Sequence, residues 1–226
     1  MCGRFLNRTP AAETARIFGT KNALPNWPPR YNLAPTDGAL AVRFNPETRE
    51  RSLDVLRWGL IPFWSKDKKI GYSLINARAE GIDTKPSFLE AFERRRCLIP
   101  ADGFYEWKKL EAKTKQPYAI VPTGNEPFAF AGLWERRKDP ASGEIIRSCS
   151  IVTGEPNELL APIHNRMPVI LDSASWPAWL GETATERAEL LALLKPFPAE
   201  RMRAYTIGPR VGNVCNDDPS LLEAVA

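Results

Sequence analysis

The sequence predicts an α+β fold, in which a single compact domain is built on curved, mostly antiparallel β-sheet with a few peripheral helices. Short β-rich runs outnumber helical segments, turn signals separate them, and 21 prolines favour irregular connections. A chain of 226 residues is long enough to bury a sizeable core. Because no repeat, low-complexity tract or linker divides the chain, we expect one domain over residues 1–226.

Three helices are expected, over residues 11–18, 86–94 and 185–194. The first has Pro10 at its start and Gly19 at its end, the usual places for these two residues. In the third, Leu190, Leu191 and Leu194 form an apolar stripe at helical spacing. Strands are expected in the β-rich runs at residues 53–58, 118–121, 128–133, 151–153, 169–171 and 205–207.

Composition describes an ordinary globular protein, with 43% hydrophobic and 26% charged residues. A formal charge of +4 favours anionic partners only mildly. The N-terminus lacks an apolar signal region, and no stretch approaches the roughly 20 apolar residues that span a bilayer. We therefore expect a cytoplasmic protein with no membrane contact. The arginine-rich runs at residues 94–96 and 136–138 are expected to be solvated faces.

The four cysteines are Cys2, Cys97, Cys149 and Cys215, and they include no CxxC pair. With His164 as the single histidine, no recognisable zinc spacing exists. We expect no metal, no cofactor and no disulfide. Cys97 and Cys149 lie in apolar runs, which favours a role as small buried hydrophobic residues.

Met1 is followed directly by Cys2. Initiator methionine is normally trimmed when the next side chain is small, which would leave Cys2 as the first residue. A terminal cysteine carries a thiol and a free α-amine on adjacent carbons, with reference pKa values of roughly 8.5 and 7.7–8.0. An aldehyde forms an imine with the amine and is then captured by the thiol as a thiazolidine. The sequence thus indicates an aldehyde or acyl substrate, and the alternative is a frayed terminus with a chance cysteine.

Two side chains are candidates for proton transfer. His164 precedes an apolar strand, follows a predicted short helix, and is the only imidazole in the chain. Its alternative role is a solvent-facing or capping histidine. Glu106 lies among aromatic residues in a predicted strand, where apolar surroundings would raise its pKa and suit it to acid–base work. Its alternative role is an edge-strand glutamate that faces water.

Other segments offer groups that bind anions or bases. Asn76 is a neutral hydrogen-bonding group, and Arg78 carries a planar fork suited to phosphate or carboxylate. The aromatic run at residues 58–64 is followed by Lys66, Lys68 and Lys69. Aromatics next to cations suit single-stranded nucleic acid, because bases stack and phosphates pair. The same pattern also fits a core strand that leads into a solvated lysine loop.

Taken together, these motifs closely resemble the SRAP family, the abasic-site processing proteins that crosslink to DNA. The resemblance runs in order from Cys2 to about Asn216, leaving a short C-terminal tail, and is carried by residues 1–5, 31–35, 58–62, 76–78, 97–107, 131–134, 164–168 and 211–214. Each motif alone is weak. Their joint occurrence with Cys2, Asn76, Glu106 and His164 is highly specific.

The resemblance implies an abasic-site sensor with associated lyase activity and self-processing peptidase activity in the response to DNA damage. Cys2, exposed by loss of Met1, would attack the ring-opened aldehyde of an abasic site in single-stranded DNA and end as a thiazolidine. Asn76 would orient the terminal cysteine, and Glu106 would handle protons at the amine and imine. His164 would act on the sugar oxygen during ring opening and reversal.

The resemblance also implies the residues that contact DNA. Arg4, Arg78 and Arg166 match positions that hold phosphates around the lesion, and Thr153 would add a backbone contact. Pro35 and Trp64 match a wedge that excludes duplex DNA, which would favour junctions between single and double strands. We expect a monomer.

Three other functions use some of the same residues. An N-terminal-nucleophile amidohydrolase also begins with a mature Cys-Gly, and a thiol peptidase would pair Cys2 with His164. A plain single-stranded DNA-binding module would need Arg78 and Arg166 but not Cys2, so the substitution Cys2→Ala separates it from the others.

Overall fold

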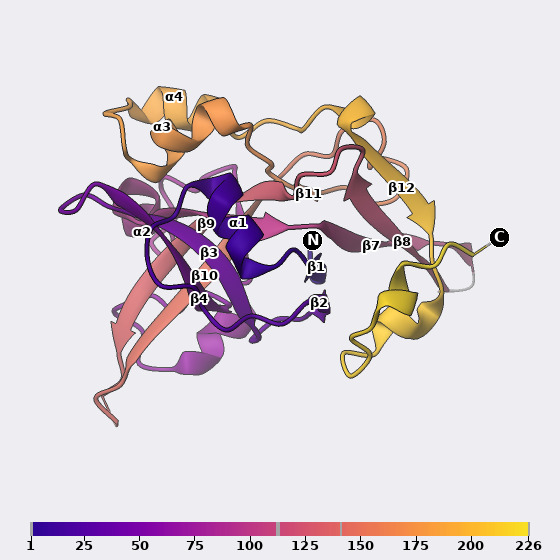
Figure 1. Ribbon diagram of the computed structural model, residues 1–226, viewed down its shortest axis with the longest axis horizontal. Coiled ribbons are helices and arrows are strands. Elements are labelled where there is room, and N and C mark those ends of the chain that lie inside the picture. Colours follow the sequence, from indigo (N-terminus) through magenta and orange to yellow (C-terminus); the bar gives the residue numbers. More distant parts are fainter. Residues whose placement is uncertain (1, 112–113, 141, 226) are drawn as a thin grey trace.

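Two β-sheets form the framework of the computed structural model, which describes residues 2–111, 114–140 and 142–225 (Figure 1). The first sheet is antiparallel throughout, in the order β12 (Met202–Thr206), β8 (Lys115–Pro122), β7 (Gly103–Lys109), β1 (Phe5–Asn7) and β2 (Arg30–Leu33). In Figure 1, β1 lies centrally, between the strands of the second sheet and β7 with β8. The chain's N-terminal residues therefore lie where the two sheets meet.

The second sheet closes on itself. Its ring consists of β10 (Ile145–Gly154), β4 (Glu50–Trp58), β3 (Gly38–Asn45), β6 (Arg96–Ala101) and β9 (Phe128–Lys138), with β9 pairing back to β10. Two short strands, β5 (Asn76–Arg78) and β11 (Met167–Pro168), add to the far end of β10. Pairings of β10 with β4 and β5 are parallel, and the others are antiparallel. The predicted α+β class with mostly antiparallel sheet is confirmed.

Helices cover the outside of this barrel. They are α1 (Ala11–Phe18), α2 (Leu89–Arg94), α3 (Trp176–Leu180) and α4 (Arg187–Ala192), with short 3₁₀ turns at Lys68–Tyr72, Ser173–Ser175, Ala199–Arg201, Pro209–Gly212 and Pro219–Leu222. The bounds of α1 match the prediction, and Gly19 ends it with a φ of 68°, which glycine adopts without strain. Helix α2 begins three residues later than predicted, because the main chain from Lys85 to Phe88 forms a turn. No helix in the described part of the chain is long and apolar enough to span a bilayer.

Four of the six predicted strands fall within longer ones. The one predicted at residues 205–207 runs past the end of β12 at Thr206, because the ladder with β8 ends there and Ile207 bridges to Ala224 instead. Residues 169–171 are extended but form no strand of their own. Val169 donates to the carbonyl of Val152 on β10, whereas Leu171 donates to the carbonyl of Ala129 on β9. Because the segment crosses from one strand to the other, neither ladder continues.

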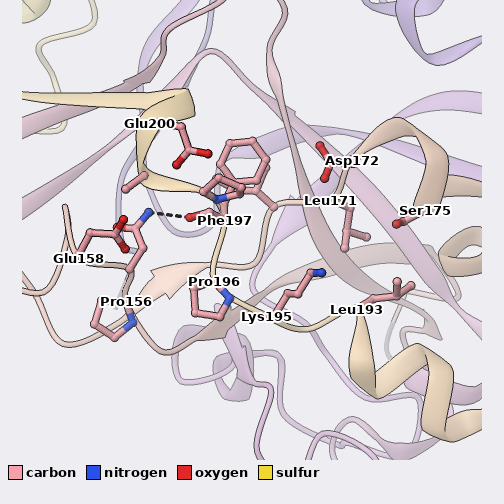
Figure 2. A pocket seen from close by; sticks show the side chains of 14 residues that line it. Pro156, Glu158, Leu171, Asp172, Ser175, Leu193, Lys195, Pro196, Phe197 and Glu200 are labelled. Carbon is pink, nitrogen blue, oxygen red and sulfur yellow. Dashed lines mark hydrogen bonds between the residues drawn. The ribbon is translucent and has the colours of Figure 1, made fainter.

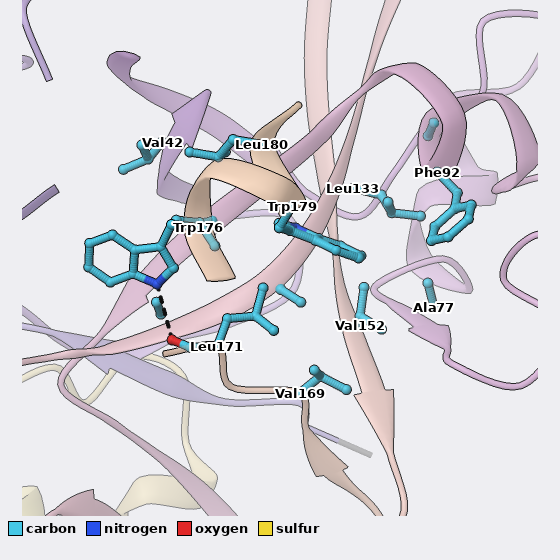
Figure 3. Close-up of a cluster of buried hydrophobic side chains, with 14 of the residues drawn as sticks. Val42, Ala77, Phe92, Leu133, Val152, Val169, Leu171, Trp176, Trp179 and Leu180 are labelled. Atoms are coloured by element: carbon cyan, nitrogen blue, oxygen red, sulfur yellow. Dashed lines mark hydrogen bonds between the residues drawn. The ribbon is translucent and has the colours of Figure 1, made fainter. Parts of the chain in front are cut away.

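Alternation along the barrel strands divides their side chains between two buried clusters. One cluster lies under the helices, and Figure 3 shows Trp176 and Trp179 of α3 in it, with Trp176 donating to the carbonyl of Leu171 at 3.1 Å. Trp176 also stacks on Phe18 with ring centroids 4.5 Å apart, and Trp179 donates to the carbonyl of Cys97. The other contains Phe5 of β1 against Trp58 of β4, with centroids 5.0 Å apart. This edge contact ties the first sheet to the barrel.

The predicted burial of Cys97 and Cys149 is confirmed. Cys97 and Cys149 are fully buried free thiols in the second cluster, and Cys215 is exposed. The segment after Asn216 is packed onto the domain: Leu221 is buried, and Ala224 bridges to Ile207.

Candidate active site

The pairing of β1 with β7 brings Cys2 to Glu106. In this antiparallel pair Phe5 lies opposite Phe104. The amide of Tyr105 also donates to the carbonyl of Arg4, so the same register continues before β1 begins. Gly3 therefore falls opposite Glu106, and Cys2 lies directly before Gly3. Its thiol donates to the carbonyl of Arg4 at 3.8 Å.

Asn76 fixes the main chain of Cys2. Its Nδ2 donates to the Cys2 carbonyl at 2.9 Å, and Asn76 itself is held opposite Ile151 in the parallel pair of β5 with β10. Asn76 is only 8% exposed, and its Oδ1 has no hydrogen-bond partner among the described residues. A barrel side chain thus holds the N-terminal residue, and it retains one acceptor at that point.

Burial keeps the thiol of Cys2 protonated in the chain that carries Met1. Cys2 is fully buried in the second cluster, and this burial raises the pKa of its thiol far above the ordinary value. The negative charge of Glu106 raises this pKa further. In this form Cys2 is therefore a neutral thiol.

Glu106 is a buried acid and does not face water. It lies on β7 with 2% of its surface exposed, and this burial raises its pKa to about 7. A carboxyl group with that pKa is present in both protonation states near neutrality, so it can give or accept a proton. The predicted environment of Glu106 is confirmed.

His164 lies close to Glu106. Its Nε2 lies 3.9 Å from Oε2 of Glu106, and its Nδ1 lies 3.1 Å from the amide nitrogen of Arg166. Burial lowers the pKa of His164, which favours the neutral imidazole at pH 7. The predicted short helix before it is wrong, because Leu160 to Ile163 close successive turns.

Three of the residues expected to contact DNA form one cluster. Arg78 and Thr153 lie opposite each other in the pair of β5 with β10, and Arg166 donates from Nη2 to the Thr153 carbonyl at 2.5 Å. Arg78 is exposed, whereas Thr153 is fully buried. The Thr153 carbonyl also accepts from the amide of Ala79, so this group serves the fold.

Arg4 lies directly before β1 and is partly buried. Its Nη1 donates to the carbonyl of Gly3 at 3.1 Å, and its Nε is buried without a partner in the described residues. Burial lowers the pKa of Arg4, and the charge of Asp37 opposes that shift. The buried Nε therefore remains a donor that the described residues do not use.

Pro35 and Trp64 occupy two separate turns near the end of β4. The amide of Asp37 donates to the carbonyl of Ala34 around Pro35, and Thr36 has a φ of 84° there. A β-branched residue in that region is strained, and such strain concentrates at functional sites. Trp64 is 50% exposed.

The structure adds residues that the motifs do not identify. Glu80 pairs with both Nη atoms of Arg166, at 2.7 and 2.9 Å, although 86 positions separate them. Asp37 acts on Arg4 across 33 positions. No local pattern in the sequence relates such distant charges.

A separate cavity of about 540 Å³ lies between residues 156–158 and 193–200 (Figure 2). Its buried polar side chain, Asn157, donates to the carbonyl of Phe197 at 2.7 Å and accepts from the amide of Leu160. None of the predicted site residues lines this cavity. In the described part of the chain, no three His, Cys, Asp or Glu side chains gather as metal ligands do.

Comparisons with known proteins cover nearly the whole chain. Residues 1–214 match the protein-family model described as SOS response associated peptidase (SRAP). The abasic site processing proteins YoqW and YoaM of Bacillus subtilis are each 43% identical over 226 residues, covering 99% of this chain and 100% and 98% of their own lengths. An X-ray structure of a protein from Bacteroides thetaiotaomicron matches with a TM-score of 0.90 and 29% identity, covering all of both chains.

Proposed function

The chain belongs to the SRAP family, as its motifs predicted, and we propose that it is an abasic-site sensor that joins its mature N-terminal Cys2 covalently to abasic single-stranded DNA. Two observations support the proposal. The relatives YoqW and YoaM are abasic site processing proteins by name. Cys2 is held by Asn76 next to Glu106, whose pKa of about 7 suits reversible proton transfer.

The covalent step balances as a condensation. Loss of Met1 frees the α-amine of Cys2, which adds to the C1′ aldehyde of the opened sugar and forms a carbinolamine. This intermediate expels one water to give the imine. The Cys2 sulfur then bonds to the same carbon, and the thiol proton ends on nitrogen, which closes the thiazolidine.

Glu106 would serve both halves of this sequence. As the neutral acid it protonates the departing hydroxyl of the carbinolamine. As the carboxylate it then removes the proton of the thiol, whose own ionisation burial disfavours. Asn76 would keep the amine directed at the aldehyde through its bond to the Cys2 carbonyl.

His164 would act on the sugar. Its Nε2 and the Glu106 carboxyl face each other at 3.9 Å, longer than a direct hydrogen bond. In the proposed complex a sugar oxygen bonds to both groups, so His164 exchanges the ring-oxygen proton during ring opening and reversal. An imine that fails to close would permit β-elimination, which gives the lyase activity.

Arg4, Arg78 and Arg166 would hold phosphates on either side of the lesion. Arg78 is exposed, and Arg166 is kept in place by the Thr153 carbonyl. Such contacts bind without sequence preference and weaken with salt. Pro35 and Trp64 would exclude duplex DNA, and the preferred substrate is then a single-strand to double-strand junction.

Counting free thiols in the purified adduct tests the thiazolidine. The chain has four cysteines, and ring closure consumes one of them. Alkylation of the denatured adduct followed by mass measurement should add three alkyl groups, against four for the free protein. An adduct that accepts four groups would be an imine, and the proposed end product would be wrong.

A further inference from the structure

Arg137 is a buried arginine on β9. The sequence predicts a solvated face at residues 136–138, and this is wrong for Arg137, which is 2% exposed. Its guanidinium donates to two main-chain carbonyls 71 or more positions away, from Nε to Ser65 at 2.7 Å and from Nη2 to Lys66 at 3.0 Å. Burial of a charged side chain is costly unless its hydrogen bonds hold something specific.

A second contact, from the residue directly after β9, holds the same segment. Asp139, two residues beyond Arg137 on that face, pairs with Lys68. Ser65 is itself buried, and its hydroxyl donates to the carbonyl of Asp67 at 2.9 Å. The far end of β9 therefore fixes residues 65–68 at several points.

The segment so fixed presents aromatic side chains to solvent. The amide of Ser65 donates to the carbonyl of Pro62 at 3.0 Å, which closes a turn with Phe63 and Trp64 at its tip. Phe63 is 53% exposed and Trp64 is 50% exposed. Across the described residues, the exposed aromatic side chains are these two and Tyr72 of the same loop.

The loop of residues 59–75, which carries this turn, adjoins the candidate active site at both ends. It leaves β4 after Trp58, whose Nε1 donates to the carbonyl of Ile75 at 2.9 Å, and it ends at Asn76, which bonds to Cys2. A displacement of the aromatic turn would therefore change how a DNA strand reaches Cys2, and it would leave the reacting groups unaltered.

We propose that Arg137 is a positioning residue for substrate binding, whose buried guanidinium fixes the Phe63–Trp64 turn against unpaired bases beside the lesion. This inference rests on the function proposed above. Exposed aromatic side chains stack on bases of any sequence. A turn that is already ordered loses little conformational entropy when single-stranded DNA binds to it. The positive charges of the neighbouring Lys66 and Lys69 complement the negative charge of the DNA phosphates.

The variants Arg137→Met and Arg137→Lys test the role by crosslinking kinetics over a range of DNA concentrations. Arg137→Met should raise the half-saturating DNA concentration about 5- to 10-fold and leave the saturated rate unchanged. Lysine keeps the charge but not the planar fork, so it should restore part of the affinity. Arg136→Met is the matched control, since it removes the same charge from an exposed neighbour and should change the half-saturating concentration less than 2-fold.

A combined variant separates positioning from general damage. In a background with both Phe63→Ala and Trp64→Ala, Arg137→Met should cause little further loss, because the side chains that it positions are gone. An equal loss in both backgrounds, or a fall in the saturated rate alone, would overturn the inference. If the wild type itself forms no Cys2-dependent adduct, the proposed function fails first, and that outcome is distinct from normal crosslinking by Arg137→Met.

Discussion

Arg166 and Glu80 form a two-pronged ion pair at the edge of the candidate active site, with Nη1 2.7 Å from Oε1 and Nη2 2.9 Å from Oε2. The Glu80 side chain is 57% exposed, whereas that of Arg166 is 14% exposed. The guanidinium that would hold a phosphate therefore already holds a carboxylate, and the carboxylate can leave toward solvent.

We expect Glu80→Gln to increase affinity for abasic single-stranded DNA about 2- to 5-fold, because phosphate no longer competes for Arg166 and an exposed ion pair is weak. Fluorescence anisotropy at low salt would measure the change. Glu93→Gln is the control, since Glu93 pairs with Arg187 away from the site. The gain should disappear in an Arg166→Gln background, and a gain that persists there would mean that Glu80 does not act through Arg166.

His164→Gln should slow crosslink formation or reversal by about 100-fold or more, the usual contribution of a general acid–base group. DNA affinity should stay near that of the wild type, because the His164 ring accepts from the main-chain amide of Arg166 and not from the guanidinium that would hold a phosphate. Single-turnover kinetics and anisotropy would separate the two effects. A large loss of binding with little change in rate would assign His164 a structural role.

Glu106→Gln should slow crosslinking and remove a break near pH 7 from the pH–rate profile, because burial raises the Glu106 pKa to about 7. Rates measured from pH 5 to 9 for both proteins would check this. Equal rates and equal profiles would exclude Glu106 from the proposed mechanism.

The raised pKa of Glu106 also predicts that the stability of the protein depends on pH. The folded protein favours protonated Glu106, so the contribution of Glu106 to the free energy of unfolding is greatest below pH 4.5 and is lost as pH rises to about 7. Denaturant unfolding should show wild type losing about 3 kcal/mol relative to Glu106→Gln between pH 4.5 and 8. The comparison isolates Glu106, since both proteins keep His164, whose lowered pKa acts in the opposite direction. A constant difference across this range would contradict the burial argument.

Cys2→Ser should give at most an imine-type adduct, because a hydroxyl is a weaker nucleophile than a thiol toward the imine carbon. Such an adduct should be lost on heating and trapped by borohydride. A Cys2→Ser adduct as heat-resistant as that of the wild type would rule out the thiazolidine.

Much of the fold could be predicted because its signals are local. Gly19 ends α1 by adopting a conformation that other residues avoid, and the alternating pattern of β4 and β9 is readable within each strand. Helix α3 was missed because it has only five residues and depends on Trp179 filling the core. The segment at residues 169–171 has strand composition, but its hydrogen bonds are shared between two strands.

The candidate site divides in the same way. Cys2, Asn76, Glu106 and His164 could be named because each belongs to a recognisable motif. Arg137 and Glu80 could not, because their partners are far away in the sequence. The partners of Arg137 lie 71 and 72 positions away and that of Glu80 lies 86 positions away. The run of charged residues predicts Arg137 on the surface, whereas the alternation of side chains along β9 turns that of Arg137 inward.

The most direct test of the central claim is denaturing gel electrophoresis of the Met1-trimmed protein after incubation with single-stranded DNA that carries one abasic site. We expect a shifted band that resists heat, requires the lesion and disappears in Cys2→Ala. A trimmed, folded protein that binds this DNA yet gives no such band would contradict covalent capture by Cys2.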